Sequence, residues 1–345
     1  MRRTPRVPGR RTVVAVALAC ALTATVQQQP ARAEPTTLTE VRAELDRLYH
    51  DAEVATDKYN AADEKVTAQQ KRVRTLTTQI GTAEKKLTRL TSLAGAAARA
   101  QYRGGGLPAE AQFVLAPNPA LALDTASIAR QAQQTTENVL TALTRTREEL
   151  TDSKADASDE LRRLTASRKA RAAERKTIEK HIADARKLEA LLSAQQRRDL
   201  EALEKRTAGE SQDKWEQTGI LKKVGDKAGA AGRKAIAFAT RQLGKPYVWG
   251  AQGPSSFDCS GLTSQAWLAA GIPIPRTSQE QWRQLKHVPV EKMRPGDLII
   301  YFSGATHVAI YIGEGQIIHA PRPGRWVTVA PAASMAILGV VRPDA

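Results

Sequence analysis

The sequence predicts an α+β protein in which a long α-helical coiled-coil hairpin precedes a C-terminal domain of helices and an antiparallel sheet of about five strands. Residues 36–98 contain no proline, and apolar residues recur there in alternating steps of three and four. That rhythm is typical of a coiled coil rather than of a compact globular core. After residue 233, short apolar or alternating runs are separated by turns, which is typical of antiparallel strands.

The predicted hairpin spans residues 34–206 and has its tip around residues 103–124, where glycines and prolines interrupt the heptad rhythm. A second, looser apolar stripe follows from about residue 125 to residue 206. We expect the two arms to pair antiparallel, each being about 100 Å long at about 1.5 Å per residue. The apolar tip segment Phe113–Leu115 is either a connector that packs on itself or a docking site for a partner.

The C-terminal domain is expected to cover residues 233–345, after a polar, Gly- and Lys-rich linker at residues 207–232. A chain of this length can bury a core unaided. Two helices are expected first, at residues 234–243 and 259–270, and Gly271 suits the C-terminal cap of the second. The strands are expected in the runs GDLIIYF, HVAIYIG, GQIIHAP, WVTVAP and AILGVV.

The N-terminus has the pattern of a secretory signal peptide, residues 1–33. A basic stretch without acidic residues precedes an apolar run, and Ala31-Arg32-Ala33 supplies a small-x-small cleavage pattern. We expect a mature chain that begins at Glu34 and leaves by the general secretory route. No other segment approaches the roughly 20 apolar residues of a membrane-spanning helix. The mature protein is therefore expected outside the cytoplasmic membrane, without a transmembrane segment.

The charge balance favours an anionic partner. The formal net charge is +16, and removing the six arginines of the predicted signal peptide leaves about +10. Export disfavours nucleic acid as that partner and favours an anionic polymer of the cell envelope. The alternative is that the charge only solvates the long helices, which carry most of the lysines and arginines.

Cys259 is the single cysteine expected in the mature chain, because Cys20 lies in the predicted signal peptide. It cannot form an intramolecular disulfide, and a lone thiol in an oxidising compartment is buried or useful. Asp258 is a good N-cap residue, which places Cys259 in the first turn of a helix. There the backbone N–H groups and the helix dipole favour a thiolate. The alternative is a small buried hydrophobic residue.

A cysteine nucleophile needs a base and a group that orients the base. Of the five histidines, His50 and His181 are expected to be solvated on the helices, and His287 to be incidental in a polar loop. His307 and His319 fall in consecutive predicted strands, so they can face the same side of one hairpin. We therefore expect His307 to be the base beside the cysteine and His319 to be its orienting partner.

Six segments after residue 233 resemble the NlpC-type family of secreted cell-wall cysteine peptidases: LGKPYVWG, FDCSGL, PRTSQEQ, RPGDLIIY, HVAIYIG and IIHAP. The resemblance covers about a third of the chain, in the family's order, and implies a papain-like fold. It implies the same roles for Cys259, His307 and His319, and it adds Tyr247, whose hydroxyl would help to polarise the oxyanion. Ala251 stands where the family usually has a second glycine, a small departure.

The resemblance implies a peptidoglycan endopeptidase that cleaves stem peptides between D-isoglutamate and the third-position diamino acid, by acyl transfer and without a metal or other cofactor. Asp258, Ser260 and Arg276 flank the expected cleft and are candidates to bind charged groups of the stem peptide. Their alternative roles are a helix cap, a residue of the first helical turn and a surface ion pair.

The resemblance also implies a role for the coiled coil, which in such exported enzymes holds the peptidase inactive or docks it to a membrane partner at the division site. Two other functions stay open. One is an amidase or acyltransferase on the same papain-like core, and the other is an inactive scaffold that activates another wall hydrolase. The Cys–His–His order favours the endopeptidase.

Overall fold

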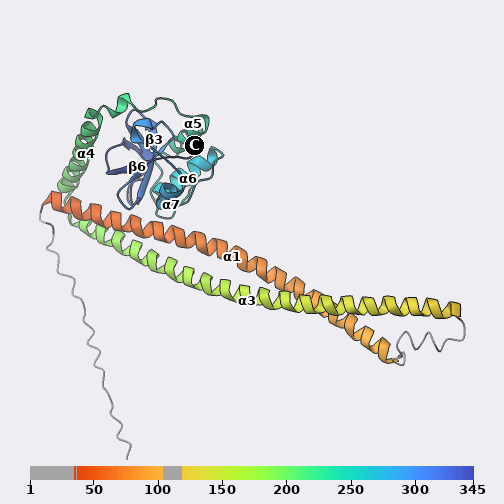
Figure 1. Cartoon of the computed structure of the whole chain (residues 1–345). Helices are drawn as coiled ribbons and strands as arrows, with labels where there is room; N and C mark the ends of the chain where they lie inside the picture. Colours follow the sequence, from red (N-terminus) through yellow and green to blue (C-terminus); the bar gives the residue numbers. More distant parts are fainter. Residues whose placement is uncertain (1–34, 36, 104–118) are drawn as a thin grey trace, which may run out of the picture.

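The computed structural model describes residues 35, 37–103 and 119–345 and has the predicted α+β architecture (Figure 1). Helices α1 (Leu38–Arg103) and α3 (Pro119–Leu191) lie side by side and antiparallel. The C-terminal domain sits at the end of this hairpin where α1 begins. The predicted signal peptide and the tip segment Phe113–Leu115 lie outside the described residues. No described helix is long and apolar enough to cross a membrane.

The two helices of the hairpin pack tightly only near the C-terminal domain, in the part that we call the proximal half (residues 38–76 and 146–191). There Leu45, Ile178 and Ala185 are almost completely buried. In the distal half, residues 77–103 and 119–145, no described side chain is buried. The helices cross and then diverge toward the tip (Figure 1), which leaves part of the predicted apolar stripe facing solvent.

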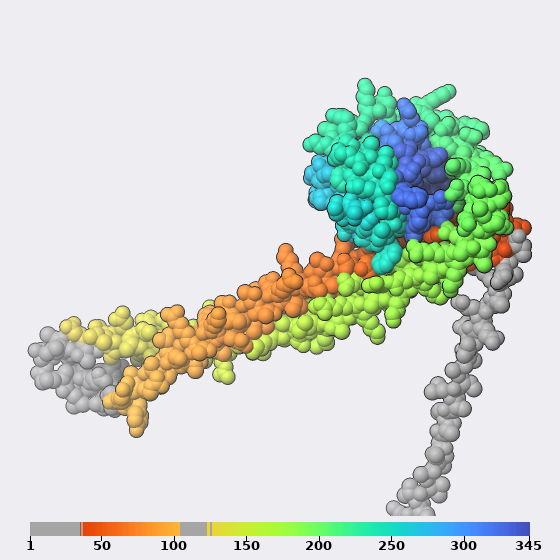
Figure 2. All heavy atoms as spheres, turned by 180° about the vertical axis from the view of Figure 1, so that it is seen from behind, coloured from red at the N-terminus to blue at the C-terminus, as the bar shows by residue number. Residues whose placement is uncertain are grey.

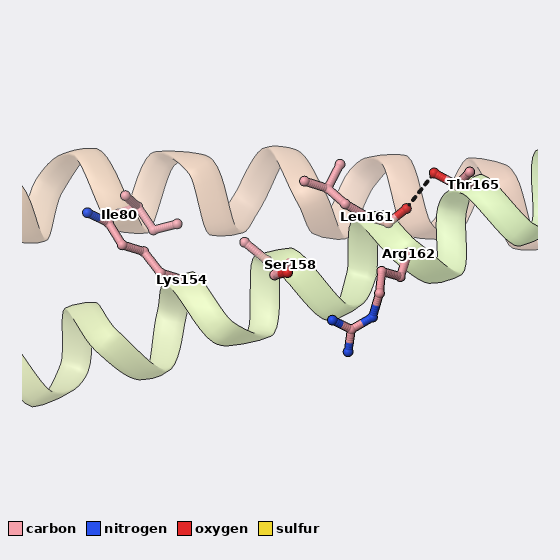
Figure 3. Close-up of a pocket in the computed structure, with 7 residues that line it drawn as sticks. Ile80, Lys154, Ser158, Leu161, Arg162 and Thr165 are labelled. Carbon is pink, nitrogen blue, oxygen red and sulfur yellow. Dashed lines mark hydrogen bonds between the residues drawn. The ribbon is translucent and has the colours of Figure 1, made fainter. Parts of the chain in front are cut away.

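A shallow groove follows the line where α1 and α3 begin to diverge (Figure 3). Ile80 of α1 and Leu161 of α3 supply its apolar wall, and Lys154 and Arg162 stand at its edge. Lys154 forms an ion pair with Glu84 across the two helices, at 2.8 Å. This groove contains none of the predicted catalytic residues.

The predicted linker differs from the structure, because its first eleven residues are helical. Helix α4 (Ala194–Gln217) starts at Ser193, whose side chain and that of Gln196 form a capping box that separates α4 from α3. Gln212 fixes α4 to the C-terminal domain by donating to the carbonyl of Gly315 and accepting from the N–H of Ala333. A short 3₁₀ turn, η1 (Ile220–Lys222), follows.

The C-terminal domain is built on one antiparallel sheet with the strand order β1-β6-β2-β3-β4-β5. The sheet has six strands rather than about five, because a three-residue edge strand with no apolar alternation was not predicted. The helices are α5 (Ala230–Thr240), α6 (Cys259–Ala269) and α7 (Ser278–Gln284), with a 3₁₀ turn η2 (Val290–Lys292). The strands are β1 (Lys286–Val288), β2 (Leu298–Tyr301), β3 (His307–Gly313), β4 (Gln316–His319), β5 (Thr328–Pro331) and β6 (Ile337–Arg342).

The sheet carries its main core on the face that helices α5 and α6 cover. Leu262 and Trp267 of α6 pack there against apolar residues of β2 and β3, among them Val308 and Ile310. Gly271 follows α6 with a φ of +89°, as expected of a C-terminal cap. This packing sets the start of α6 beside the start of β3, and so fixes the position of Cys259 relative to His307.

The C-terminal domain rests directly on the proximal half of the hairpin (Figure 2). Arg322, in the connection from β4 to β5, lies over the ring of Tyr49 of α1 and pairs with Glu189 of α3 and Glu204 of α4. Tyr59 of α1 meets the ring of Trp249 edge to face. The domain thus contacts the N-terminal part of α1 and the C-terminal end of α3, and the distal half of the hairpin extends into solvent.

Candidate active site

Cys259 is the first residue of α6, as predicted, and Asp258 is its N-cap residue. The Asp258 carboxylate accepts a hydrogen bond from the N–H of Gly261 at 2.6 Å. The cysteine is only 4% exposed. Burial raises the pKa of its thiol well above the ordinary value, and the nearby charges of Asp258, Asp57 and Glu53 act in the same direction. The expectation of a lowered pKa is therefore wrong for this state of the protein, because burial and carboxylates outweigh the helix dipole.

His307 and His319 meet as the strand pattern predicted. His307 begins β3 and His319 ends β4, and the His307 Nε2 atom lies 3.0 Å from His319 Nδ1. Both rings are buried. Burial lowers the pKa of His307 to about 4 and that of His319 well below its ordinary value, so both imidazoles are neutral. In a neutral pair one ring donates its N–H and the other accepts it.

Tyr247 lies buried in the same apolar cluster as Cys259, which agrees with its expected position near the nucleophile. Burial raises the pKa of its hydroxyl well above the ordinary value, and the charges of Cys259 and Glu53 add to that effect. The hydroxyl therefore keeps its proton and can donate a hydrogen bond.

The other three candidate residues form one buried network. Arg276 donates to both carboxylate oxygens of Asp258, at 3.0 and 2.6 Å, and to the hydroxyl of Ser260 at 2.8 Å. The alternative role of Arg276 as a surface ion pair is wrong, because both partners are buried. Asp258 combines its cap role with this ion pair, and the network fixes the first turn of α6 that carries Cys259.

Helix α1 places Glu53 directly on the expected catalytic base. The Glu53 Oε1 atom lies 3.2 Å from His307 Nδ1, and the side chain is 8% exposed. Since His307 Nε2 is already paired with His319, both ring nitrogens of His307 are occupied. His307 Nδ1, the nitrogen that His319 leaves for another partner, is therefore bound to a carboxyl group of the hairpin.

Two further polar residues of α1 enter the same cleft, one and two turns after Glu53. Asp57 Oδ2 accepts a hydrogen bond from the hydroxyl of Ser278 at 2.8 Å, and Asn60 Nδ2 donates to Asp258 Oδ2 at 3.2 Å. Both side chains are 4% exposed. The spacing of four and three residues places Glu53, Asp57 and Asn60 on one face of the helix. That face covers the site from the base to the N-cap of α6.

Burial changes the protonation of the two carboxyl groups of α1. It raises the pKa of Glu53 to about 8 and that of Asp57 to about 8. The hydroxyl of Ser278 partly offsets this effect for Asp57, and His50 and Arg322 partly offset it for Glu53. At neutral pH both acids are therefore mainly uncharged when the helix occupies the cleft.

The expected solvated role of His50 is wrong, because its ring packs edge to face on Phe302 and its Nδ1 lies 3.3 Å from the hydroxyl of Thr306. His287, expected to be incidental, stacks on Trp282. Within residues 35, 37–103 and 119–345, no three His, Cys, Asp or Glu side chains are arranged to hold a metal ion.

Little in the sequence singled out Glu53, Asp57 and Asn60, because polar residues between heptad positions are normally solvated. The stripe changes nearby from leucines to the small residues Ala52 and Ala55, but these pack mainly against Ile178 and Ile182 of α3. That change therefore gave no sign of the C-terminal domain on the neighbouring face of α1.

The NlpC/P60 family matches residues 244–336. Over 93 residues the chain is 48% identical to a probable endopeptidase of Corynebacterium glutamicum, a match that covers 27% of this chain and 44% of that protein. It is 46% identical over 91 residues to the probable endopeptidase p60 of Listeria monocytogenes, covering 26% and 19% of the two chains. The chain thus spans less than half the length of these relatives.

Two solved structures are also similar. A hypothetical invasion protein of Mycobacterium tuberculosis is 36% identical, with 33% of this chain and 62% of that chain covered and a TM-score of 0.30. The P60 domain of an antigen of M. avium subspecies paratuberculosis is 34% identical, with 32% and 92% covered and a TM-score of 0.30. The family match and the sequence identities to relatives support one conclusion: the C-terminal part of this chain belongs to the NlpC/P60 family.

Proposed function

We propose that this protein is a secreted peptidoglycan endopeptidase that hydrolyses stem peptides between D-isoglutamate and the diamino acid, and that its hairpin holds it inactive. The observation that carries the proposal is the pairing of His307 with His319 at 3.0 Å beside a buried cysteine at a helix start. The naming of similar proteins as probable endopeptidases supports the reaction class. The cell-wall substrate and the scissile bond follow from the family resemblance.

The chemistry would use the three residues in sequence. With the cleft open, His307 Nδ1 takes the thiol proton of Cys259, and the thiolate attacks the γ-carbonyl carbon of D-isoglutamate. The Tyr247 hydroxyl and a backbone N–H at the start of α6 would stabilise the resulting oxyanion. The protonated His307 then gives its proton to the leaving amine, and a water molecule, deprotonated by His307, hydrolyses the thioester. His319 keeps the ring of His307 oriented throughout.

The hairpin in this arrangement blocks two requirements of that chemistry. Glu53 occupies His307 Nδ1, the nitrogen that this mechanism assigns to the thiol proton, and Asp57 and Asn60 bind Ser278 and Asp258, the residue that precedes Cys259. A substrate would therefore have to displace α1 before it reached the thiol. Asp258 and Ser278, whose polar atoms α1 now covers, would then face the stem peptide, and Asp258, Ser260 and Arg276 stay the proposed contacts for its charged groups.

A docking role for the hairpin belongs to the same proposal. The distal half leaves Leu93, Ile128 and Leu140 about half exposed or more. Such an apolar surface suits a partner better than solvent. A membrane protein at the division site is the partner that the family resemblance implies, and binding to the distal half would act on α1, which also enters the cleft.

The test is mass spectrometry of purified peptidoglycan fragments incubated with the chain and with its Cys259→Ala variant. We expect the parent to release products cut between D-isoglutamate and the diamino acid slowly, because α1 must first leave the site, and the variant to release none. Products cut at the lactyl amide would identify an amidase. Release of the same products by the variant would overturn the thiol mechanism. No release by the parent, even when Asn60→Trp displaces α1, would favour a scaffold that activates another hydrolase.

A further inference from the structure

The face of α1 that packs on the site is acidic, and the two arginines that the structure describes near it, Arg276 and Arg322, are already paired with other acids. Glu53, Asp57 and Asp258 converge there, and all three are buried. Arg276 is committed to Asp258 through two hydrogen bonds. Two buried carboxyl groups therefore arrive on α1 without a dedicated counter-ion, and burying a charge without a partner is strongly unfavourable.

Every element packed against Glu53 contributes to this balance. His307 of β3 faces it at 3.2 Å, Asp258 precedes α6, and Arg322 comes from the connection between β4 and β5. Arg322 is already paired with Glu189 and Glu204. From α1 itself, His50 is the positive group when protonated and Asp57 the second acid.

Asp57 is surrounded by hydroxyl and amide groups and by further acids. Ser278 and Gln279 of α7 donate to it, while the charges of Asp258 and Glu53 oppose its ionisation. Arg276 and the Cys259 thiol lie in the same electrostatic neighbourhood. None of these groups offers Asp57 a salt bridge.

We propose that closure of α1 over the catalytic cleft is coupled to proton uptake, so that Glu53 and Asp57 enter the cleft as neutral carboxylic acids and the hairpin is released as they ionise. This inference rests on the proposed occlusion of the site by the hairpin and adds that pH controls it. The fraction of molecules in which α1 has left the site should then increase as pH rises.

The hydrogen bonds suit neutral acids. A protonated Glu53 donates its O–H to His307 Nδ1, and the His307 Nε2–H group donates in turn to His319 Nδ1, which gives a chain of uncharged donors and acceptors. Asp57 accepts from Ser278 on Oδ2, and a protonated carboxyl group keeps the acceptor capacity that this hydrogen bond needs. The upward shift of the pKa of both acids to about 8 agrees with this assignment.

The direction of the pH dependence follows from comparing the closed and open states. In the open state the two carboxyls return toward their ordinary pKa values of 4.5 and 3.8, so opening releases protons up to about pH 8. His307 acts in the opposite direction below about pH 6.5, because its pKa is about 4 when closed and ordinary when open. The opening constant should therefore rise most steeply between about pH 6.5 and 8, by up to about tenfold per pH unit for each carboxyl.

The hinge for such an opening is the break between α3 and α4. Gln212 holds α4 on the C-terminal domain, while the capping box at Ser193 ends the continuous helix of the hairpin. The α1–α3 pair can thus swing as one body about this break, a motion that also separates the start of α1 from Leu200 and Thr207 of α4. A distance between the distal half of α1 and the C-terminal domain reports this motion without depending on catalysis.

The experiment measures energy transfer between two dyes whose emission does not depend on pH. The dyes are attached at Thr82→Cys in the distal half and Lys234→Cys on α5, both exposed positions. Residues 34–345 with Cys259→Ser serve as the parent, so the two introduced cysteines are its only thiols. Glu53→Gln, Asp57→Asn and the double variant replace each acid by a neutral amide of the same shape. Asp51→Asn, two residues before Glu53 and paired with Arg47 of α1, is the matched control.

We expect the closed fraction of the parent and of Asp51→Asn to fall as pH rises from 6.5 to 8.5. Each single amide variant should show about half that slope in log units, and the double variant should stay closed over the whole range. A parent whose transfer efficiency does not change between pH 6 and 9, or a double variant that opens over the same range as the parent, would overturn the proposal. If the pH response follows this pattern while wall fragments are never cleaved, the proposed peptidase function fails and the proton coupling stands.

Discussion

The proximal and distal halves of the hairpin continue one heptad pattern, but different groups are buried in them. In the proximal half the polar side chains of Glu53, Asp57 and Asn60 are buried under the C-terminal domain. In the distal half apolar side chains such as Leu93 and Leu140 are 46% and 50% exposed. A heptad stripe therefore predicts a helix and its apolar face, but which face is covered depends on what packs against the helix in the folded protein.

The largest effect is expected from a side chain that prevents the proximal face of α1 from packing on the site. In Asp57→Arg, closure would force a much longer side chain into a position that is 4% exposed, and such overpacking costs up to about 3 kcal/mol. We therefore expect the rate of stem-peptide cleavage to rise by up to about 100-fold. The assay is the release of peptide products from purified peptidoglycan fragments.

Leu90→Arg is the control, because it introduces the same long positive side chain into the distal half of α1, away from the cleft. Its cleavage rate should equal that of the parent. An Asp57→Arg chain with the parent's rate would show that the proximal face does not limit access to Cys259.

Substitutions of apolar residues in the two halves of the hairpin should differ in their effect on the free energy of unfolding. Ile178 is fully buried in the proximal half, so Ile178→Ala should lower the free energy of unfolding by about 2–5 kcal/mol. Leu140→Ala, at a half-exposed distal position, should change it by less than about 0.5 kcal/mol. Urea unfolding followed by helical circular dichroism measures both. Equal losses would mean that the distal half packs as tightly as the proximal half.

The smallest effect is expected at the contact between Arg322 and the hairpin. Arg322→Gln removes ion pairs with Glu189 and Glu204 that are partly exposed, so the loss should be about 1 kcal/mol. Cleavage should rise about fivefold at low salt and less in high salt, where such pairs are screened. Arg283→Gln, which breaks the exposed pair with Glu280 on α7, is the control and should have no effect. A salt-independent gain would argue against an ionic contact.

Much of the C-terminal domain was predictable because its signals are local. Asp258 predicted the start of α6, and the strand runs predicted the meeting of His307 and His319. The edge strand β1 was not predicted, because its three residues are too few to show the alternation of apolar and polar side chains that is typical of a strand. The helical part of the expected linker was missed because Gln212 finds its partners, Gly315 and Ala333, only in the folded domain.

The burial and protonation of the site could not be predicted, because they depend on contacts between residues 198 and 221 positions apart in the sequence. The helix-dipole argument for Cys259 considered only its own turn of α6. In the folded chain, burial and the acids of α1 raise the pKa of the thiol instead. The residues next to Cys259 in the sequence thus predict a reactive thiol, whereas in the folded chain that thiol is buried and its pKa is raised.

The most direct test of this account is the rate at which iodoacetamide alkylates Cys259 in the chain lacking residues 1–33, where it is the single thiol. Asn60→Trp places a bulky neutral side chain against Asp258 and Gly250, so it should displace α1 without adding charge near the thiol. The account predicts alkylation at least about tenfold faster in Asn60→Trp than in the parent at the same pH. Equal rates in a variant that folds with the parent's circular dichroism spectrum would contradict the claim that α1 protects the cysteine.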